Sequence, residues 1–162
     1  MALTMERRNY KGTRKEARAL TAYVKLMRAS EAVTVRIHRP VVDAGLTVTQ
    51  FGVLEALYSL GPLSQRDIAR KILKSTGNIT FVIDKLEQRG LVRRERNRKD
   101  RRLYAVDLTQ AGRRMIRSMF PRHAARVVRE MKSLTVSEQE ELSRLCRKVG
   151  LGGEGKKGNK TQ

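Results

Sequence analysis

The ten residues from Arg93 to Arg102 form the densest group of positive charge in the chain, since seven of them are Arg or Lys and two are acidic. Such side chains neutralise nucleic-acid phosphates, and Arg is favoured where a narrow minor groove concentrates negative potential. A run of charge more often forms only a solvated surface. Groove binding is favoured here because the run lies in a predicted hairpin, beside a helix whose outward side chains suit DNA.

That helix is predicted over residues 75–88, with Ser75 as its cap. Short polar side chains near its start are of the types that contact base edges or phosphates, and helix N-termini attract phosphate. The outward residues are Thr76, Gly77, Asn78, Thr80 and Phe81, with Lys85 further along. Two interpretations of Phe81 stay open: contact with a thymine methyl group, or sideways packing on the hairpin or a neighbouring helix.

Three short helices and a hairpin position these side chains. Thr47 with Gln50, and Ser64 with Asp67, have the spacing of helix N-caps, and Ser75 opens the third helix. Each helix carries a narrow apolar face, so the three must share one small core. Strands are predicted at 91–96 and 103–108. This order is typical of a winged helix-turn-helix, in which the second helix of the pair enters the major groove.

Longer helices flank this lobe. Residues 14–39 contain no Gly or Pro, and Pro40 is expected to end the helix. Its two apolar stripes indicate packing against a partner chain as well as its own. Thr109 caps a helix to about residue 132, which Pro121 should kink. Its predicted core stripe is Ile116, Met119, Phe120, Ala124, Val127, Val128 and Met131. A last helix opens at Thr135 and carries Leu142, Leu145 and Val149.

The predicted fold is mainly α (α+β), a winged helix-turn-helix with a helical dimerisation region formed by the N- and C-terminal helices. The expected division of the chain is a flexible N-terminus at 1–13, a dimerisation helix at 14–45, the DNA-binding lobe at 46–108, C-terminal dimerisation helices at 109–149, and a disordered basic tail at 150–162.

Composition narrows the class of partner. The net charge of +20 favours nucleic acid, with an anionic membrane surface as the second option. No segment approaches the roughly 20 apolar residues of a membrane span, so we expect a soluble, cytoplasmic protein without membrane contact. A general DNA-compacting, architectural protein would suit the same charge. An RNA-binding protein is less favoured, because no aromatic stacking platform is evident.

The sequence contains no residue pattern that indicates a catalytic site or a metal site. The histidines, His38 and His123, are isolated, no phosphate-binding glycine loop is present, and Cys146 is the single cysteine. We therefore expect no enzyme activity, no metal and no cofactor. Cys146 has basic neighbours that would favour a thiolate, but its position beside Leu145 favours a buried structural role over a redox sensor.

Several segments together resemble the core of the MarR family of transcriptional regulators. They are Leu46–Leu54, Gly61–Leu63, Ile83–Val92, Asp100–Arg102 and Val106–Gly112. The resemblance covers roughly residues 20–149, and the order and spacing of the segments make it specific. One departure lies in the wing, where the family often has Asn-Pro and this chain has Asn97-Arg98-Lys99.

The resemblance implies a homodimer that binds double-stranded DNA at a pseudo-palindromic operator, as a repressor more than as an activator. It implies that Asp84 pairs with Arg102 and holds the wing, with Asp100 also in support, while Arg98 or Arg101 enters the minor groove. The predicted DNA-binding residues are Ser64, Gln65, Arg66, Ser75, Thr76, Gly77, Asn78, Thr80, Phe81, Lys85, Arg98, Lys99, Arg101 and Arg102.

Many members of the family bind a small aromatic acid or phenol between the dimer helices and the DNA-binding lobe. Residues placed to line such an effector pocket here are Tyr23, Met27, His38, Phe51 and Tyr58. For each of these side chains, ordinary packing is the competing interpretation. The sequence does not identify a ligand.

Overall fold

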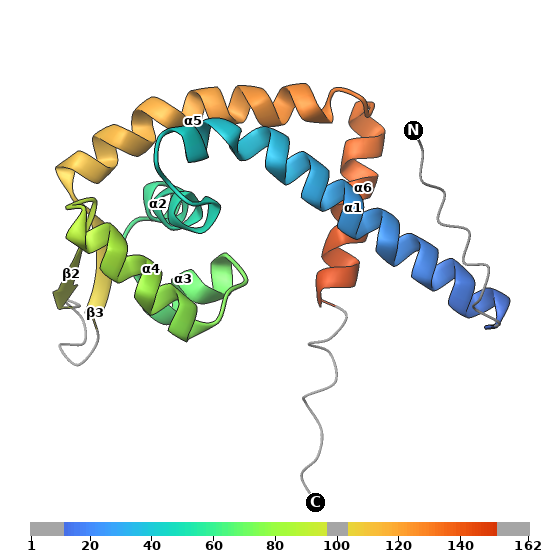
Figure 1. Cartoon of the computed structure of the whole chain (residues 1–162), viewed down its shortest axis with the longest axis horizontal. Coiled ribbons are helices and arrows are strands. Elements are labelled where there is room, and N and C mark those ends of the chain that lie inside the picture. Colours follow the sequence, from blue (N-terminus) through green and yellow to red (C-terminus); the bar gives the residue numbers. More distant parts are fainter. Residues whose placement is uncertain (1–11, 97–103, 152–162) are drawn as a thin grey trace, which may run out of the picture. The chain divides into compact units, whose positions relative to one another are not determined.

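The computed structural model describes residues 12–96 and 104–151. Its elements are α1 (Arg14–Asp43), α2 (Val48–Leu60), β1 (Leu63–Ser64), α3 (Gln65–Lys71), α4 (Thr76–Gln88), β2 (Val92–Arg96), β3 (Tyr104–Leu108), α5 (Gln110–Met131) and α6 (Val136–Leu151) (Figure 1). The chain forms two compact units, Met1–Arg39 and Pro40–Gln162, which are described separately. No helix in the described part of the chain is both long and apolar enough to cross a membrane.

The helix starts follow the predicted caps. Thr47 and Gln50 form a reciprocal capping box at α2, with bonds of 3.0 and 3.1 Å. The hydroxyls of Ser64, Ser75, Thr109 and Thr135 likewise accept backbone N–H bonds at the starts of α3, α4, α5 and α6. Each such cap stabilises a helix by about 1 kcal/mol. These local signals therefore explain where the short helices of the lobe begin.

The predicted end of the first helix was wrong, because α1 continues through Pro40 to Asp43. The residue before a proline only disfavours the helical conformation, and packing can offset that preference. Val41 is 3% exposed and belongs to the core of the second unit. The N–H of Ala44 also bonds to the carbonyl of Pro40 at 3.1 Å, which continues the helical pattern past the proline.

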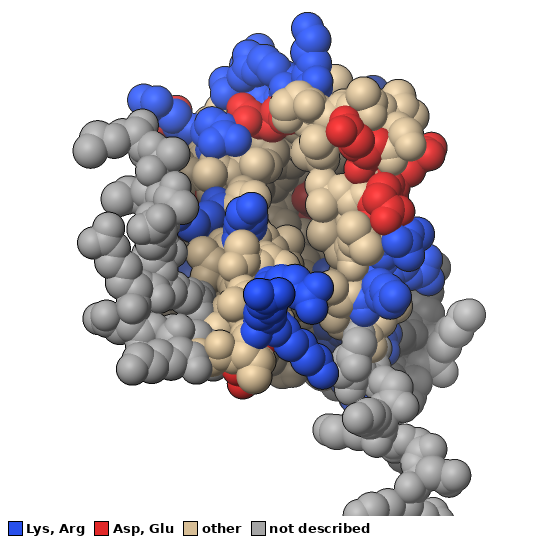
Figure 2. All heavy atoms as spheres, turned by 90° about the vertical axis from the view of Figure 1, so that its right-hand side faces the viewer, with Lys and Arg blue, Asp and Glu red and all other residues tan. Residues whose placement is uncertain are grey.

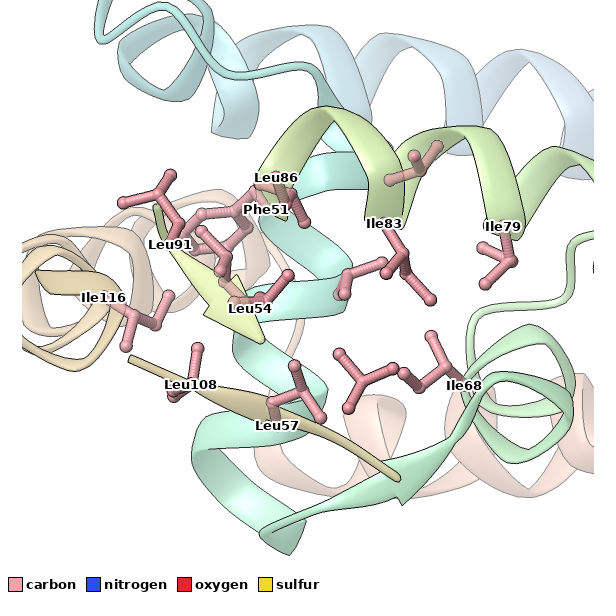
Figure 3. Packing of buried hydrophobic residues seen from close by; sticks show 14 of the residues in the cluster. Phe51, Leu54, Leu57, Ile68, Ile79, Ile83, Leu86, Leu91, Leu108 and Ile116 are labelled. Carbon is pink, nitrogen blue, oxygen red and sulfur yellow. The ribbon is translucent and has the colours of Figure 1, made fainter. Parts of the chain in front are cut away.

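The shared core predicted for the three short helices is confirmed. Figure 3 shows their side chains meeting between α2, α4 and the strands. The labelled members are Phe51, Leu54, Leu57, Ile68, Ile79, Ile83, Leu86, Leu91, Leu108 and Ile116. Burying one such side chain contributes about 1.5–3 kcal/mol. This core fixes which side of α4 faces inward.

The sheet is antiparallel, in the order β1-β3-β2. The hairpin of β2 and β3 confirms the predicted wing strands, with Val92 opposite Leu108. The two-residue strand β1 was not predicted, and it pairs Leu63 with Val106. Thr109 alone separates β3 from α5, and its hydroxyl donates to the carbonyl oxygen of Gly90, just before β2, at 2.6 Å.

The predicted core stripe of α5 was wrong at Val128, while Ala124, Val127 and Met131 are half-buried. Ile116 is buried, but Val128 is 71% exposed. In α6 no residue is buried, and Val149 is 67% exposed. Cys146 is exposed, so the preferred buried role for this thiol was wrong as well. Its apolar neighbour Leu145 is exposed too, so α6 of the single chain offers no core that would enclose a thiol.

The ends of α6 and α1 refine the predicted boundaries. α6 continues to Leu151, two residues into the segment expected to be disordered. The rest of that tail lies outside the described residues. At the other end, α1 begins at Arg14 as predicted, and Thr13 forms a capping box with Glu16 through bonds of 2.7 and 3.2 Å.

Candidate nucleic-acid interface

α4 presents the predicted outward residues to solvent. Its inward side is anchored in the core by residues such as Ile79 and Ile83, both fully buried. The outward residues Ser75, Thr76, Gly77, Asn78, Phe81 and Lys85 are exposed, and Thr80 is half-buried. The hydroxyl of Thr80 donates to the carbonyl of Thr76 at 3.1 Å. A rigid helix therefore carries a row of short polar groups on one exposed side.

Phe81 lies in this row as a large apolar side chain that is 64% exposed. The ammonium nitrogen of Lys85 lies 5.6 Å from the centroid of its ring, within the range of a cation–π interaction. The exposure of the ring disfavours the sideways-packing interpretation within the described part of the chain. The presence of an exposed phenyl ring in a row of polar side chains is therefore not explained by packing within the described residues.

The turn between α3 and α4 contains a feature that the sequence did not reveal. Leu73 has φ +54, in the left-handed region that disfavours residues with a Cβ atom, and it is 88% exposed. Such a conformation costs about 1 kcal/mol or more. The turn is closed by the N–H of Lys74, which bonds to the carbonyl of Ala69 at 3.0 Å. This geometry sets the direction in which α4 leaves α3.

A groove of about 830 Å³ lies beside the start of α4. It is lined by Ser64, Gln65, Arg66, Asp67, Arg70, Thr76, Arg94 and Tyr104. Of these residues, Asp67 accepts a hydrogen bond from the hydroxyl of Ser64 at 2.7 Å and pairs with Arg70 at 2.8 Å. Gln65 and Arg66, predicted from sequence as contacts, therefore lie on the same surface as the start of α4.

Arg94 of β2 joins the wing to α4 and α3. Its guanidinium forms ion pairs with Asp84 and Glu87 on α4, and the backbone N–H of Arg94 donates to Glu87 Oε1 at 3.1 Å. With the Gln65 amide turned so that its oxygen faces Arg94, that oxygen accepts two bonds of 3.1 and 3.0 Å. Arg94 thus contacts three side chains on two helices.

Partial burial lowers the pKa of Arg94, but its hydrogen bond to Asp84 and the charges of Glu87 and Asp84 raise it more, so the net pKa lies above the ordinary value. The guanidinium therefore stays charged and neutralises two carboxylates on the helix that carries the outward polar row. Without it, those carboxylates would repel phosphate.

The predicted partner of Asp84 was Arg102, which lies outside the described residues together with Arg98, Lys99, Asp100 and Arg101. In the described part of the chain Asp84 pairs with Arg94. A signal for Arg94 exists in the sequence. Alternation along a strand places Arg94 on the same side as the buried Val92, while Asp84 and Glu87 lie one turn apart on a helix.

The predicted effector-pocket residues divide between the two units. Tyr23 and Met27 are 59% and 51% exposed, and His38 Nδ1 lies 3.0 Å from the carbonyl oxygen of Thr34. Phe51 and Tyr58 belong to the second unit, where Phe51 is fully buried.

Phe51 and Tyr58 contribute to an aromatic cluster between α2 and α5. Phe51 lies 4.7 Å from the ring of His123, and Tyr58 lies 5.9 Å from the ring of Phe120. The rings of Phe120 and His123 are 6.5 Å apart. No role was predicted for His123, which is isolated along the chain and joins this cluster only through the packing of α5.

Both charged and uncharged side chains are exposed to solvent. Figure 2 shows one face of the molecule, on which Lys and Arg side chains form several groups, some of them next to Asp and Glu side chains, with other residues exposed between them. Exposed basic groups suit a polyanion, and exposed apolar surface suits burial against another protein surface. Among the described residues, no group of three or more His, Cys, Asp or Glu side chains is arranged to hold a metal ion.

Comparison with known proteins agrees with this geometry. A model of the MarR family matches residues 46–104. The HTH-type transcriptional regulators YkoM and MhqR of Bacillus subtilis are 37% and 34% identical to the chain over 134 residues. Each alignment covers 83% of this chain, with 87% of YkoM and 92% of MhqR.

A solved structure is also similar. BpsR of Bordetella bronchiseptica, whose DNA binding is regulated by 6-hydroxynicotinic acid, superposes with a TM-score of 0.69. Its sequence is 28% identical, and the match covers 77% of this chain and 89% of BpsR. YkoM and MhqR are described as transcriptional regulators, in agreement with the prediction that the chain is not an enzyme.

Proposed function

Because this chain belongs to the MarR family of winged-helix transcriptional regulators, we propose that it represses transcription by binding a pseudo-palindromic operator as a homodimer. The exposed row on α4 carries the proposal. Thr76, Asn78 and Thr80 would contact base edges in the major groove, while Ile79 and Ile83 hold the helix in the core.

The wing would contact the adjacent minor groove through its basic residues Arg98, Lys99, Arg101 and Arg102. Arg94 supports this part, because it ties β2 to Asp84 and Glu87. We expect Arg101→Ala to weaken binding and to reduce the slope of log K against log salt by about 1, as expected for one lost cation. An unchanged affinity and slope would remove Arg101 from the interface.

The homodimer is supported by apolar side chains left exposed on the helices outside the winged lobe. Tyr23 and Met27 on α1, Val128 on α5, and Leu145 and Val149 on α6 are between 43% and 71% exposed. A single chain that exposes this much apolar surface on three long helices is suited to burial against a second copy. Two copies would also place two α4 helices on successive major grooves.

An effector is proposed at the aromatic cluster. The half-buried rings of Tyr58 and Phe120, which lie 5.9 Å apart, would stack on a small aromatic ligand, with the buried Phe51 behind them. DNA binding by the related BpsR is regulated by 6-hydroxynicotinic acid. Calorimetric titration with 6-hydroxynicotinic and salicylic acids tests this step. Binding that is lost in Tyr58→Ala while the protein stays folded supports it, and no binding at millimolar ligand contradicts it.

The test of the main proposal is selection of bound fragments from a randomised duplex library. We expect an inverted repeat with half-sites about 10 base pairs apart. A transcription assay on a promoter that overlaps this repeat should then show repression. If the recovered fragments share no motif, the alternative of an architectural DNA-binding protein, which the charge of +20 also suits, is favoured instead.

A further inference from the structure

Neither packing nor backbone conformation explains why position 77 is a glycine in the described part of the chain. It lies in the first turn of α4, and a Cβ atom added there meets nothing within 4 Å. Its backbone is not among the positive-φ residues, so the conformation does not require glycine. Alanine would favour the helix by up to about 1 kcal/mol. A glycine in open space is useful where an external partner approaches the backbone closely.

Phe81 follows Gly77 by four residues, and Lys85 follows Phe81 by four, so the three form one stripe along α4. The phenyl ring is 64% exposed, with open space around the glycine on one side and the Lys85 ammonium 5.6 Å from its centroid on the other. The stripe therefore presents, in order, the open space at Gly77, the exposed phenyl ring of Phe81 and the ammonium group of Lys85.

The apolar and basic groups of the stripe match two features of duplex DNA, the thymine methyl group in the major groove and the phosphates beside it. Thymine is the only base that presents a methyl group there, and apolar side chains, Phe among them, contact it. A cation one turn away suits the neighbouring phosphate. A protein or membrane partner would require a wider apolar surface. The positions three and four residues from Phe81 along α4 carry no apolar side chain, since they are Gly77, Asn78, Asp84 and Lys85.

We propose that Gly77, Phe81 and Lys85 read a thymine in each half-site. The absence of a side chain at Gly77 lets the edge of a base pair approach the helix closely, and the ring of Phe81 packs on the thymine 5-methyl group. Lys85 orients the ring and contacts a phosphate of the DNA backbone. This inference rests on the proposed function and adds to it a defined base. Specificity at that position would come from one methyl group, without a hydrogen bond from Phe81.

The experiment uses the full-length protein and a fluorescein-labelled duplex that carries the site selected from a randomised library. Thymines are replaced one at a time by deoxyuridine, which removes the methyl group and keeps base pairing. We expect one thymine per half-site whose replacement raises Kd about fourfold, the value for one buried methyl group. Phe81→Ala should bind the unmodified duplex more weakly and should not distinguish thymine from deoxyuridine there.

Phe81→Leu is the matched variant, because it keeps an apolar side chain and should retain part of the discrimination. Urea unfolding checks the fold, and an exposed ring should leave the midpoint nearly unchanged in both variants. Gly77→Ala should weaken binding without destabilising the fold. Equal sensitivity to deoxyuridine in the wild type and Phe81→Ala would overturn the inference and leave the proposed function intact. A library that yields no motif would overturn both.

Discussion

The side chain of Arg94 determines whether two carboxylates on α4 are neutralised. Asp84 and Glu87 are 45% and 38% exposed in their side chains, so water would solvate them if Arg94 were removed. Arg94→Met should therefore lower the free energy of unfolding by only about 1 kcal/mol. DNA affinity should fall more, by roughly tenfold, because unpaired carboxylates repel phosphate and the wing loses its link to α4. Urea unfolding and fluorescence anisotropy measure the two effects.

Arg93→Met is the control for this variant, because Arg93 lies next in β2 and pairs with Glu95 at 2.7 Å and with Asp107 of β3 at 3.6 Å, and with no carboxylate of α4 in the described part of the chain. It removes the same charge and should reduce affinity less. A second change, Asp84→Asn in the Arg94→Met background, should recover part of the affinity. Equal losses in both single variants, with no recovery, would show that Arg94 contributes only its charge.

At the scale of elements, the junction between the wing and α5 depends on Gly112. A Cβ atom there would lie 1.9 Å from the carbonyl oxygen of Leu91, which belongs to the backbone and cannot move aside easily. Gly112→Ala should lower the free energy of unfolding by about 2–4 kcal/mol. Gly77→Ala is the matched control, since it makes the same change in open helical space and should be neutral or stabilising. A neutral Gly112→Ala would mean that the junction adjusts at little cost.

The elements show which features the sequence can predict. The caps at Thr47, Ser64 and Ser75 depend on residues three positions apart, and all were predicted. β1 has two residues and exists only through its pairing with β3, so no local pattern indicates it. The passage of α1 through Pro40 depends on the burial of Val41, which is a tertiary effect that outweighs a local preference.

The start of α6 gives a prediction for pH. The pKa of Glu138 lies below its ordinary value, because the backbone N–H and the hydroxyl of Thr135 both donate to the carboxylate. A lowered folded-state pKa contributes stability above the unfolded pKa, and this is lost as pH falls through the folded pKa. The difference in urea midpoint between wild type and Glu138→Gln should thus shrink on acidification. Glu140→Gln, with the same charge change, is the control, and a pH-independent difference would contradict the prediction.

For the whole molecule, the net charge of +20 concerns binding to a polyanion, whereas the exposed apolar side chains concern association with a second copy. The charge favours any polyanion and gives binding that weakens with salt, but it does not distinguish a regulator from an architectural protein. The arrangement of α4, Arg94 and the sheet predicts one orientation on DNA. Two orientations related by symmetry, and with them a palindromic site, require a second copy of the chain.

The proposed dimer is therefore the property on which recognition of a palindromic site would depend. Leu145→Glu combined with Val149→Glu places charge on side chains that are 43% and 67% exposed in the single chain, so the fold should tolerate both changes. If α6 packs against a second copy, sedimentation should show a shift from dimer to monomer. Affinity for the full inverted repeat should then fall towards that for a single half-site.

Leu60→Glu is the matched control, because Leu60 is 53% exposed at the end of α2 in the winged lobe. It should remain dimeric in the same experiment. A double variant that still sediments as a dimer would exclude this part of α6 from the interface. A wild-type chain that sediments as a monomer at micromolar concentration would contradict the homodimer itself, and binding to a palindrome would then require assembly on the DNA.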